Sequence, residues 1–234
     1  MAYYFALEFI LIILTLIFRP YICSDASRKA ISIKYNHILV SREAMYSFLC
    51  CVVLSLFMGM RNDFTADYNS YAGEFQKNAA QSFKGVITDN DYMELGYRIL
   101  NKVIGIFSTN IGVYMTIIAS AFVFLIILEG RKEVISIYIY ILLFVNCGIY
   151  FLTFNLMRQG LAAAIAYAAT DYLRRGNRRK YFIAIIIATS IHTSAIVMLP
   201  HAVHKCIPCM GRNHGFQVEV GCRNSPQSLE RGWC

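Results

Sequence analysis

Arg158 and Gln159 lie in the first turn of the long, apolar, alanine-rich segment 154–173. A helix amino terminus carries a partial positive charge, which disfavours a cation there by a few tenths to about 1 kcal/mol. A bound anion would offset this cost, because the free N–H groups of a helix start and a guanidinium together form a good phosphate site. The alternative is an arginine that extends to lipid headgroups. Position and residue type therefore predict an anion-binding or a snorkelling role for Arg158.

A second polar cluster, "MRNDFTADYNSYAGEF", follows another apolar segment over residues 60–75. Arg61 leaves this segment at about the membrane level of Arg158, and Asp67 and Tyr68 follow. Tyr71 would lie one turn after Asp67 if this stretch is helical. A carboxylate can accept hydrogen bonds from sugar hydroxyls, and a ring can cover the apolar face of a sugar. A solvated acidic loop is the alternative interpretation.

His192 lies within the apolar stretch "ATSIHTSAIVMLP". If the helix continues to its outer end, His192 is about 12 Å below that end, at 1.5 Å per residue. Histidine is suited to proton exchange near neutral pH, but a histidine on an apolar face is also a common packing residue. Both interpretations remain open at this point.

The composition indicates that these residues belong to an integral membrane protein. The chain of 234 residues is 57% hydrophobic and 15% charged, and its mean hydropathy is +0.49. A soluble domain of this length would not contain repeated long apolar runs. The net charge of +8 is concentrated in short connections, as in cytoplasmic loops, and does not indicate nucleic-acid binding.

An all-α polytopic fold is predicted, with about six transmembrane helices, since a helix needs about 20 residues to cross the hydrocarbon. The basic connections are expected inside, and the amino terminus and the acidic segment 61–94 outside. Segment 95–108 is short and polar enough to be an interfacial helix instead. The predicted spans are 3–19, 44–60, 110–128, 134–152, 155–173 and 181–203, and the basic connections are 20–43, 129–133 and 174–180.

Small residues recur at every third or fourth position in the last two spans. Such spacing lets neighbouring helices approach closely, so these two spans are expected to form a tightly packed pair. The residues concerned are Gly160, Ala164 and Ala168 in one span and Ala184, Ala188, His192 and Ala195 in the other.

The character of the sequence changes after His204. Residues 1–204 form the membrane region, and residues 205–234 form a tail that contains no apolar run. The tail carries Cys206, Cys209, His214 and Cys222, which superficially resemble a zinc set, but the second ligand pair is incomplete. We therefore expect no metal site, and we interpret the tail as non-native sequence that follows a frame shift or a truncated gene.

Four motifs in order resemble the EpsG family of bacterial exopolysaccharide clusters, which is similar to Wzy-type polysaccharide polymerases. They are "R-x5-DY-x2-Y-x3-F" from Arg61, "MELGYRILNKVI" from Met93, "RQGLAAAI" from Arg158 and "IHTSAIVMLP" from Ile191. The resemblance covers about residues 1–204. Members usually continue with further spans after the last motif, so this chain could be an inactive fragment of a polymerase.

The resemblance implies polymerisation of oligosaccharide repeat units, carried on undecaprenyl diphosphate, at the outer face of the bacterial cytoplasmic membrane. It needs no cofactor, and the partners it implies are the lipid-linked substrate, the bilayer and other polysaccharide-assembly proteins. Arg61 and Arg158 would contact the diphosphate, and Gln159 would support Arg158. Sugar would be oriented by Asp67, Tyr71 and Glu94. The general base would be His192 or one of the carboxylates Asp67 and Glu94.

Two other classes of function remain compatible with the sequence. A transporter or flippase of lipid-linked sugar would also need arginines against a diphosphate, but it should carry charges through the depth of the membrane. A non-catalytic scaffold in a glycan-assembly complex would need only the small-residue packing faces. The sequence names neither the sugar nor the linkage.

Overall fold

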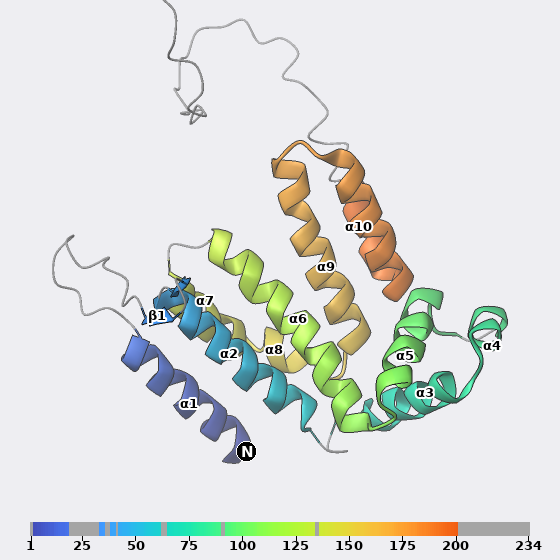
Figure 1. Ribbon diagram of the computed structural model, residues 1–234, viewed down its shortest axis with the longest axis horizontal. Coiled ribbons are helices and arrows are strands. Elements are labelled where there is room, and N and C mark those ends of the chain that lie inside the picture. The colour runs from blue at the N-terminus through green and yellow to red at the C-terminus, as the bar shows by residue number, and fades with distance from the viewer. Residues whose placement is uncertain are drawn as a thin grey trace, which may run out of the picture.

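The computed structural model describes residues 2–18, 33–35, 38–40, 42–61, 65–89, 92–133 and 136–200, most of which are helical (Figure 1). One exception is a short antiparallel hairpin in the connection 20–43, where β1 (Ile33–Tyr35) pairs with β2 (Ile38–Val40). The predicted all-α class is thus confirmed apart from this hairpin. The tail 205–234 and its cysteines lie outside the described residues. The helices are α1 (Ala2–Phe18), α2 (Arg42–Gly59), α3 (Tyr68–Ala80), α4 (Phe83–Thr88), α5 (Leu95–Phe107), α6 (Ile111–Glu133), α7 (Ile137–Asn146), α8 (Ile149–Leu152), α9 (Met157–Arg174), α10 (Arg178–Ile191) and the 3₁₀ helix η1 (Thr193–Met198).

Two of the described helices, α2 and α6, are long and apolar enough to cross a bilayer by length and composition. Both coincide with predicted spans. Helices α1 and α7 are apolar but shorter, and α9 also matches a predicted span in extent. The number of crossings is therefore a prediction, whereas the positions of these helices agree with the sequence.

Two predicted spans are not continuous helices. The run 134–152 divides into α7 and α8 at Gly148, whose φ of 78° lies in the left-handed region that glycine tolerates best. The run 181–203 divides where α10 ends at Ile191 and His192 adopts an extended backbone before η1. The predicted helix face that joined Ala188 to His192 and Ala195 is therefore wrong, because the helix stops before His192.

Close packing of α9 with α10 is confirmed, since the two helices lie side by side over most of their lengths (Figure 1). Ala164 on α9 and Ala188 on α10 are fully buried. Gly160 permits another close approach, because a Cβ there would lie 2.8 Å from the Cγ2 atom of Thr153. Small side chains thus allow α9 to pack closely against α10, as the spacing predicted, and α9 also packs against α6.

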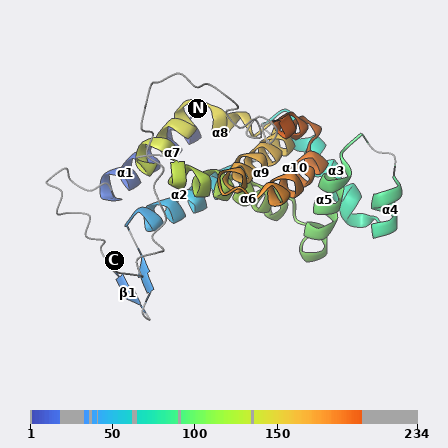
Figure 2. The same cartoon turned by 90° about the horizontal axis from the view of Figure 1, so that it is seen from above.

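Helices α3, α4 and α5 form a unit at the end of the molecule opposite α1, as both views show (Figures 1 and 2). Helix α5 packs along α3, and Gly105 permits this because a Cβ there would lie 3.0 Å from the Cα atom of Ala79. At 13 residues, α5 is about 20 Å long, too short for the hydrocarbon core of about 30 Å. Its start lies against the end of α10, and this junction holds the candidate site.

Candidate functional site

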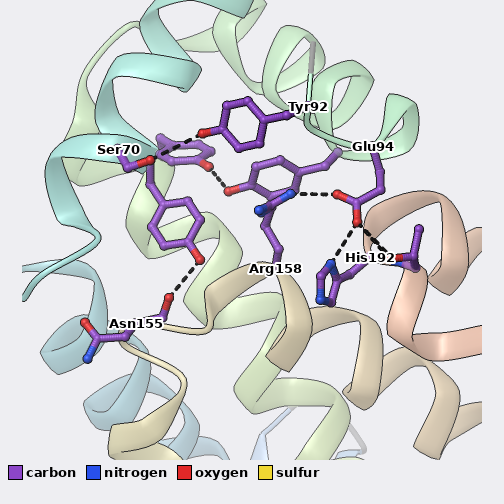
Figure 3. A network of polar contacts seen from close by, with 10 residues as sticks. Ser70, Tyr92, Glu94, Asn155, Arg158 and His192 are labelled. Carbon is purple, nitrogen blue, oxygen red and sulfur yellow. Dashed lines mark hydrogen bonds and ion pairs between the residues drawn. The ribbon is translucent and has the colours of Figure 1, made fainter.

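Glu94 lies at the centre of a polar network that joins three helices distant in sequence (Figure 3). Its Oε2 atom accepts a hydrogen bond from Nη1 of Arg158 at 2.6 Å. Its Oε1 atom lies 2.8 Å from Nδ1 of His192. The same oxygen accepts from the backbone N–H of Thr193 at 3.1 Å and from its hydroxyl at 3.4 Å. Both carboxylate oxygens are therefore engaged.

Helix ends position all of these groups. Glu94 is the extended residue that precedes α5, Arg158 is in the first turn of α9, and His192 is the residue between α10 and η1. Gly96 lets the start of α5 lie directly on the end of α10, because a Cβ there would lie 2.6 Å from the backbone oxygen of Ser190. A larger residue at position 96 would separate Glu94 from His192.

The helix dipoles account for the charges in the network. A carboxylate is favoured at the amino end of α5. The cation of Arg158 is disfavoured at the amino end of α9, and Glu94 offsets this cost by direct pairing. The anionic partner that the position of Arg158 predicted is thus present within the protein itself, as a carboxylate.

The network is enclosed but reachable, since the exposed fractions of the side chains are 15% for Glu94, 18% for Arg158 and 25% for His192. Partial burial by itself would raise the pKa of Glu94. The hydrogen bonds from Thr193, from the residue's own N–H and from His192, together with the charge of Arg158, outweigh burial and hold this pKa below its ordinary value. Glu94 is therefore an anion at neutral pH.

Tyrosine rings form the wall behind Arg158. The guanidinium carbon lies 5.7 Å from the centre of the Tyr97 ring, and the Tyr97 hydroxyl is hydrogen-bonded to that of Tyr114. Tyr71 packs against Tyr97, with ring centres 6.5 Å apart. Its hydroxyl donates to the backbone oxygen of Asn155 at 2.8 Å, a contact that Figure 3 marks with a dashed line at Asn155. Tyr71 is thus a buried part of the wall, and the sugar-orienting role expected for it stays a prediction.

Arg61 is buried, with only 3% of its surface exposed. Its Nη2 atom contacts the sulfur atoms of Met115 and Met157 at 3.6 and 3.5 Å, and its guanidinium lies 5.3 Å from the Phe154 ring. Within the described part of the chain, its Nε and Nη1 atoms have no hydrogen-bond partner. Arg61 is therefore an enclosed cation that follows the end of α2 and contacts Met157, the residue before Arg158; its role toward a diphosphate stays a prediction.

The EpsG family model matches residues 45–209, which is more than half of the chain and includes every member of the network. The chain belongs to the EpsG family. Together with the two helices of spanning length, this membership indicates a membrane protein associated with polysaccharide assembly. No curated protein and no solved structure matches the chain.

Two further predicted site residues of this EpsG family member lie beside the network. Asp67 precedes α3, and its backbone oxygen accepts the N–H of Tyr71 at 3.0 Å, so the predicted one-turn spacing is confirmed. Its side chain makes no capping hydrogen bond. Gln159 is exposed; Arg158 is hydrogen-bonded to Glu94, and the supporting role of Gln159 stays a prediction.

Sequence reasoning missed Thr193, Gly96 and Tyr97. Gly96 and Tyr97 belong to the motif that begins at Met93, and Thr193 belongs to the one that begins at Ile191, so the motif positions were the available signal. In the described ranges, no group of three or more His, Cys, Asp and Glu side chains could hold a metal ion.

Proposed function

We propose that this EpsG family member polymerises oligosaccharide repeat units carried on undecaprenyl diphosphate, at the outer face of the cytoplasmic membrane. The observation that carries the proposal is the network of His192, Glu94 and Arg158 at the junction of α5, α9 and α10. It brings together a group that can take a proton, a carboxylate that orients it and a cation, all of them partly accessible.

The reaction joins two lipid-linked oligosaccharides. A hydroxyl oxygen of the acceptor sugar attacks the anomeric carbon of the donor, and the bond from that carbon to the diphosphate oxygen breaks. The hydroxyl proton passes to a general base, and undecaprenyl diphosphate leaves with the bonding electron pair. Such a site needs a base on one side of the anomeric carbon and positive charge on the other.

His192 is the general base in this proposal. Its Nδ1 atom faces Glu94, so the Nε2 atom is the one that remains to accept a proton. Glu94 stabilises the resulting imidazolium and holds the ring in place, as a carboxylate does for a catalytic histidine. Glu94 itself is a poor base because both of its oxygens are bonded and its pKa is lowered. Among the three predicted candidates, the geometry favours His192 over Asp67 and Glu94.

Arg158 is the residue that would stabilise the leaving diphosphate. It is tied to Glu94 through Nη1, and its Nε atom has no hydrogen-bond partner in the described chain. A guanidinium can bind phosphate in addition to a carboxylate because its five N–H groups point in several directions. Arg61 would add positive potential from behind Met157 without touching the substrate.

The proposed topology has six crossings, with the amino terminus outside and the basic connection 174–180 inside. The broken pair α7–α8 and the pair α10–η1 would each serve as one crossing. A single cysteine placed at position 177 should then react with an impermeant thiol reagent only after the membrane is opened. Labelling of that cysteine in intact cells would refute this topology.

The decisive experiment supplies purified full-length protein with lipid-linked oligosaccharide and resolves the products by length. We expect a ladder of polymers from the wild type and from Gln76→Ala, an exposed control on α3, and at least a hundredfold slower elongation from His192→Gln. Equal elongation by His192→Gln would exclude the proposed base. Movement of the lipid across the bilayer without elongation would indicate a flippase. If the protein shows neither elongation nor lipid movement, a scaffold role is the interpretation that remains.

A further inference from the structure

Helices α2 and α6 border an apolar groove of about 670 Å³. Its walls include Ala44, Phe48 and Leu56 from α2 and Phe124 from α6, and the two phenylalanine side chains are more than half exposed. Among the described helices, α2 and α6 are the two that are long and apolar enough to cross a bilayer. In a bilayer, the groove between them would open toward lipid. Its volume falls in the range of about 300–1,000 Å³ that is usual for small-molecule sites.

Contact between α2 and α6 closes one end of the groove. Gly59 of α2 touches α6 at Thr116, since a Cβ on Gly59 would lie 2.5 Å from the Cα atom of Thr116. The helices then run antiparallel to the opposite end, where Ala44 and Arg131 line the groove. From Ala44 to Leu56 the wall is about 18 Å long at 1.5 Å per residue. One leaflet is about 15 Å, half of the hydrocarbon thickness of about 30 Å, so the groove accommodates a chain from one leaflet.

Arg131 supplies a cation at the other end of the groove. It is exposed in the last turn of α6, and among the described residues it has no hydrogen bond or ion pair. The neighbouring Lys132 is by contrast paired with Glu129 at 2.6 Å and with Asp171 at 3.1 Å. A guanidinium at the membrane surface beside an apolar groove is suited to a phosphate ester whose hydrocarbon chain enters the groove.

We propose that this groove binds an acyl chain of an anionic glycerophospholipid from the leaflet in which α2 begins, with its phosphate on Arg131. The proposal goes beyond the polymerase function, and only its exclusion of the polyprenyl carrier rests on that function. The polyprenyl substrate does not fit this groove, because its diphosphate would lie at Arg158. Arg158 lies near the opposite end of α6. It follows Met157, and Arg61 contacts both Met157 and Met115, which is near the start of α6. The contact of Gly59 with Thr116 closes the groove on that side.

Native mass spectrometry of the full-length protein, with phosphatidylglycerol or phosphatidylcholine of identical chains, tests the proposal. We expect preferential retention of phosphatidylglycerol and about a fivefold loss of its affinity in Arg131→Gln. The matched control is Arg179→Gln, which removes an exposed cation from the connection 174–180 and should leave this affinity unchanged. Ala121→Phe, which places a ring in the groove, should reduce retention of both lipids.

Three results would overturn the proposal. One is equal retention of the two phospholipids by the wild type, and another is the same loss in Arg179→Gln as in Arg131→Gln. The third is displacement of phosphatidylglycerol by undecaprenyl phosphate with an affinity that Arg131→Gln does not change, which would assign the groove to the carrier lipid.

Discussion

The ion pair of Glu94 and Arg158 should contribute measurably to stability, and a double-mutant cycle can measure its contribution. Glu94→Gln and Arg158→Gln each remove one charge and keep a side chain that can hydrogen-bond. Two unit charges 4 Å apart attract by about 4 kcal/mol at an effective dielectric constant of 20, before the cost of desolvation. With side chains 15% and 18% exposed, the pair lies between surface pairs, worth about 0–1 kcal/mol, and fully buried ones. We expect a coupling free energy of about 2 kcal/mol.

The assay is thermal unfolding of the purified variants in detergent. For a chain of this size 1 kcal/mol corresponds to about 2–4 °C, so Glu94→Gln should lower the apparent Tm by about 4–8 °C. The double variant should lose less than the sum of the two single losses. Lys77 and Asp89 form a matched control pair at 3.0 Å, but they are 42% and 31% exposed, and their coupling should stay below about 1 kcal/mol. Additive losses for Glu94 and Arg158 would refute the reasoning.

Two further predictions concern the same region. The pKa of Glu94 is lowered in the folded state, so the stability that the Glu94 carboxylate contributes is complete above its ordinary pKa and is lost as the pH falls through the lower folded value. The Tm difference between wild type and Glu94→Gln should therefore shrink on acidification. A constant difference down to pH 3 would contradict this. Arg61→Met should keep or raise the apparent Tm, because it replaces an enclosed cation, which has no carboxylate partner among the described residues, by a side chain suited to contact Met115 and Met157. The same variant should yield less polymer, and a Tm loss larger than that of Glu94→Gln would show that Arg61 is a structural residue.

The helices of this protein could be predicted from the sequence because hydrophobic runs and their lengths are local properties. The positions of α1, α2, α6 and α9 agree with the predicted spans. The breaks at Gly148 and His192 were not predicted. Hydropathy is high on both sides of each break, so an average over a span does not register one residue whose backbone leaves the helix.

The candidate site was predicted in part. Arg158, Glu94 and His192 were each selected from the sequence, and the structure brings these three together. Asp67 and Gln159 lie outside the network, and Arg61 and Tyr71 are buried within the protein. Residue type and position in a span do not reveal how deeply a side chain is covered, because the covering groups come from other helices.

The sequence by itself indicated a helical membrane protein and a cation at the start of α9 that either an anion or lipid headgroups would stabilise, since the helix dipole acts within a single turn. Only the tertiary structure decided which anion this is. Glu94 reaches Arg158 because the start of α5 lies near the start of α9 and against the end of α10. Gly96 permits the contact with α10. The two charges are separated by 64 residues in the chain, and interactions at such a separation depend on packing between helices, which the local pattern of residues does not specify.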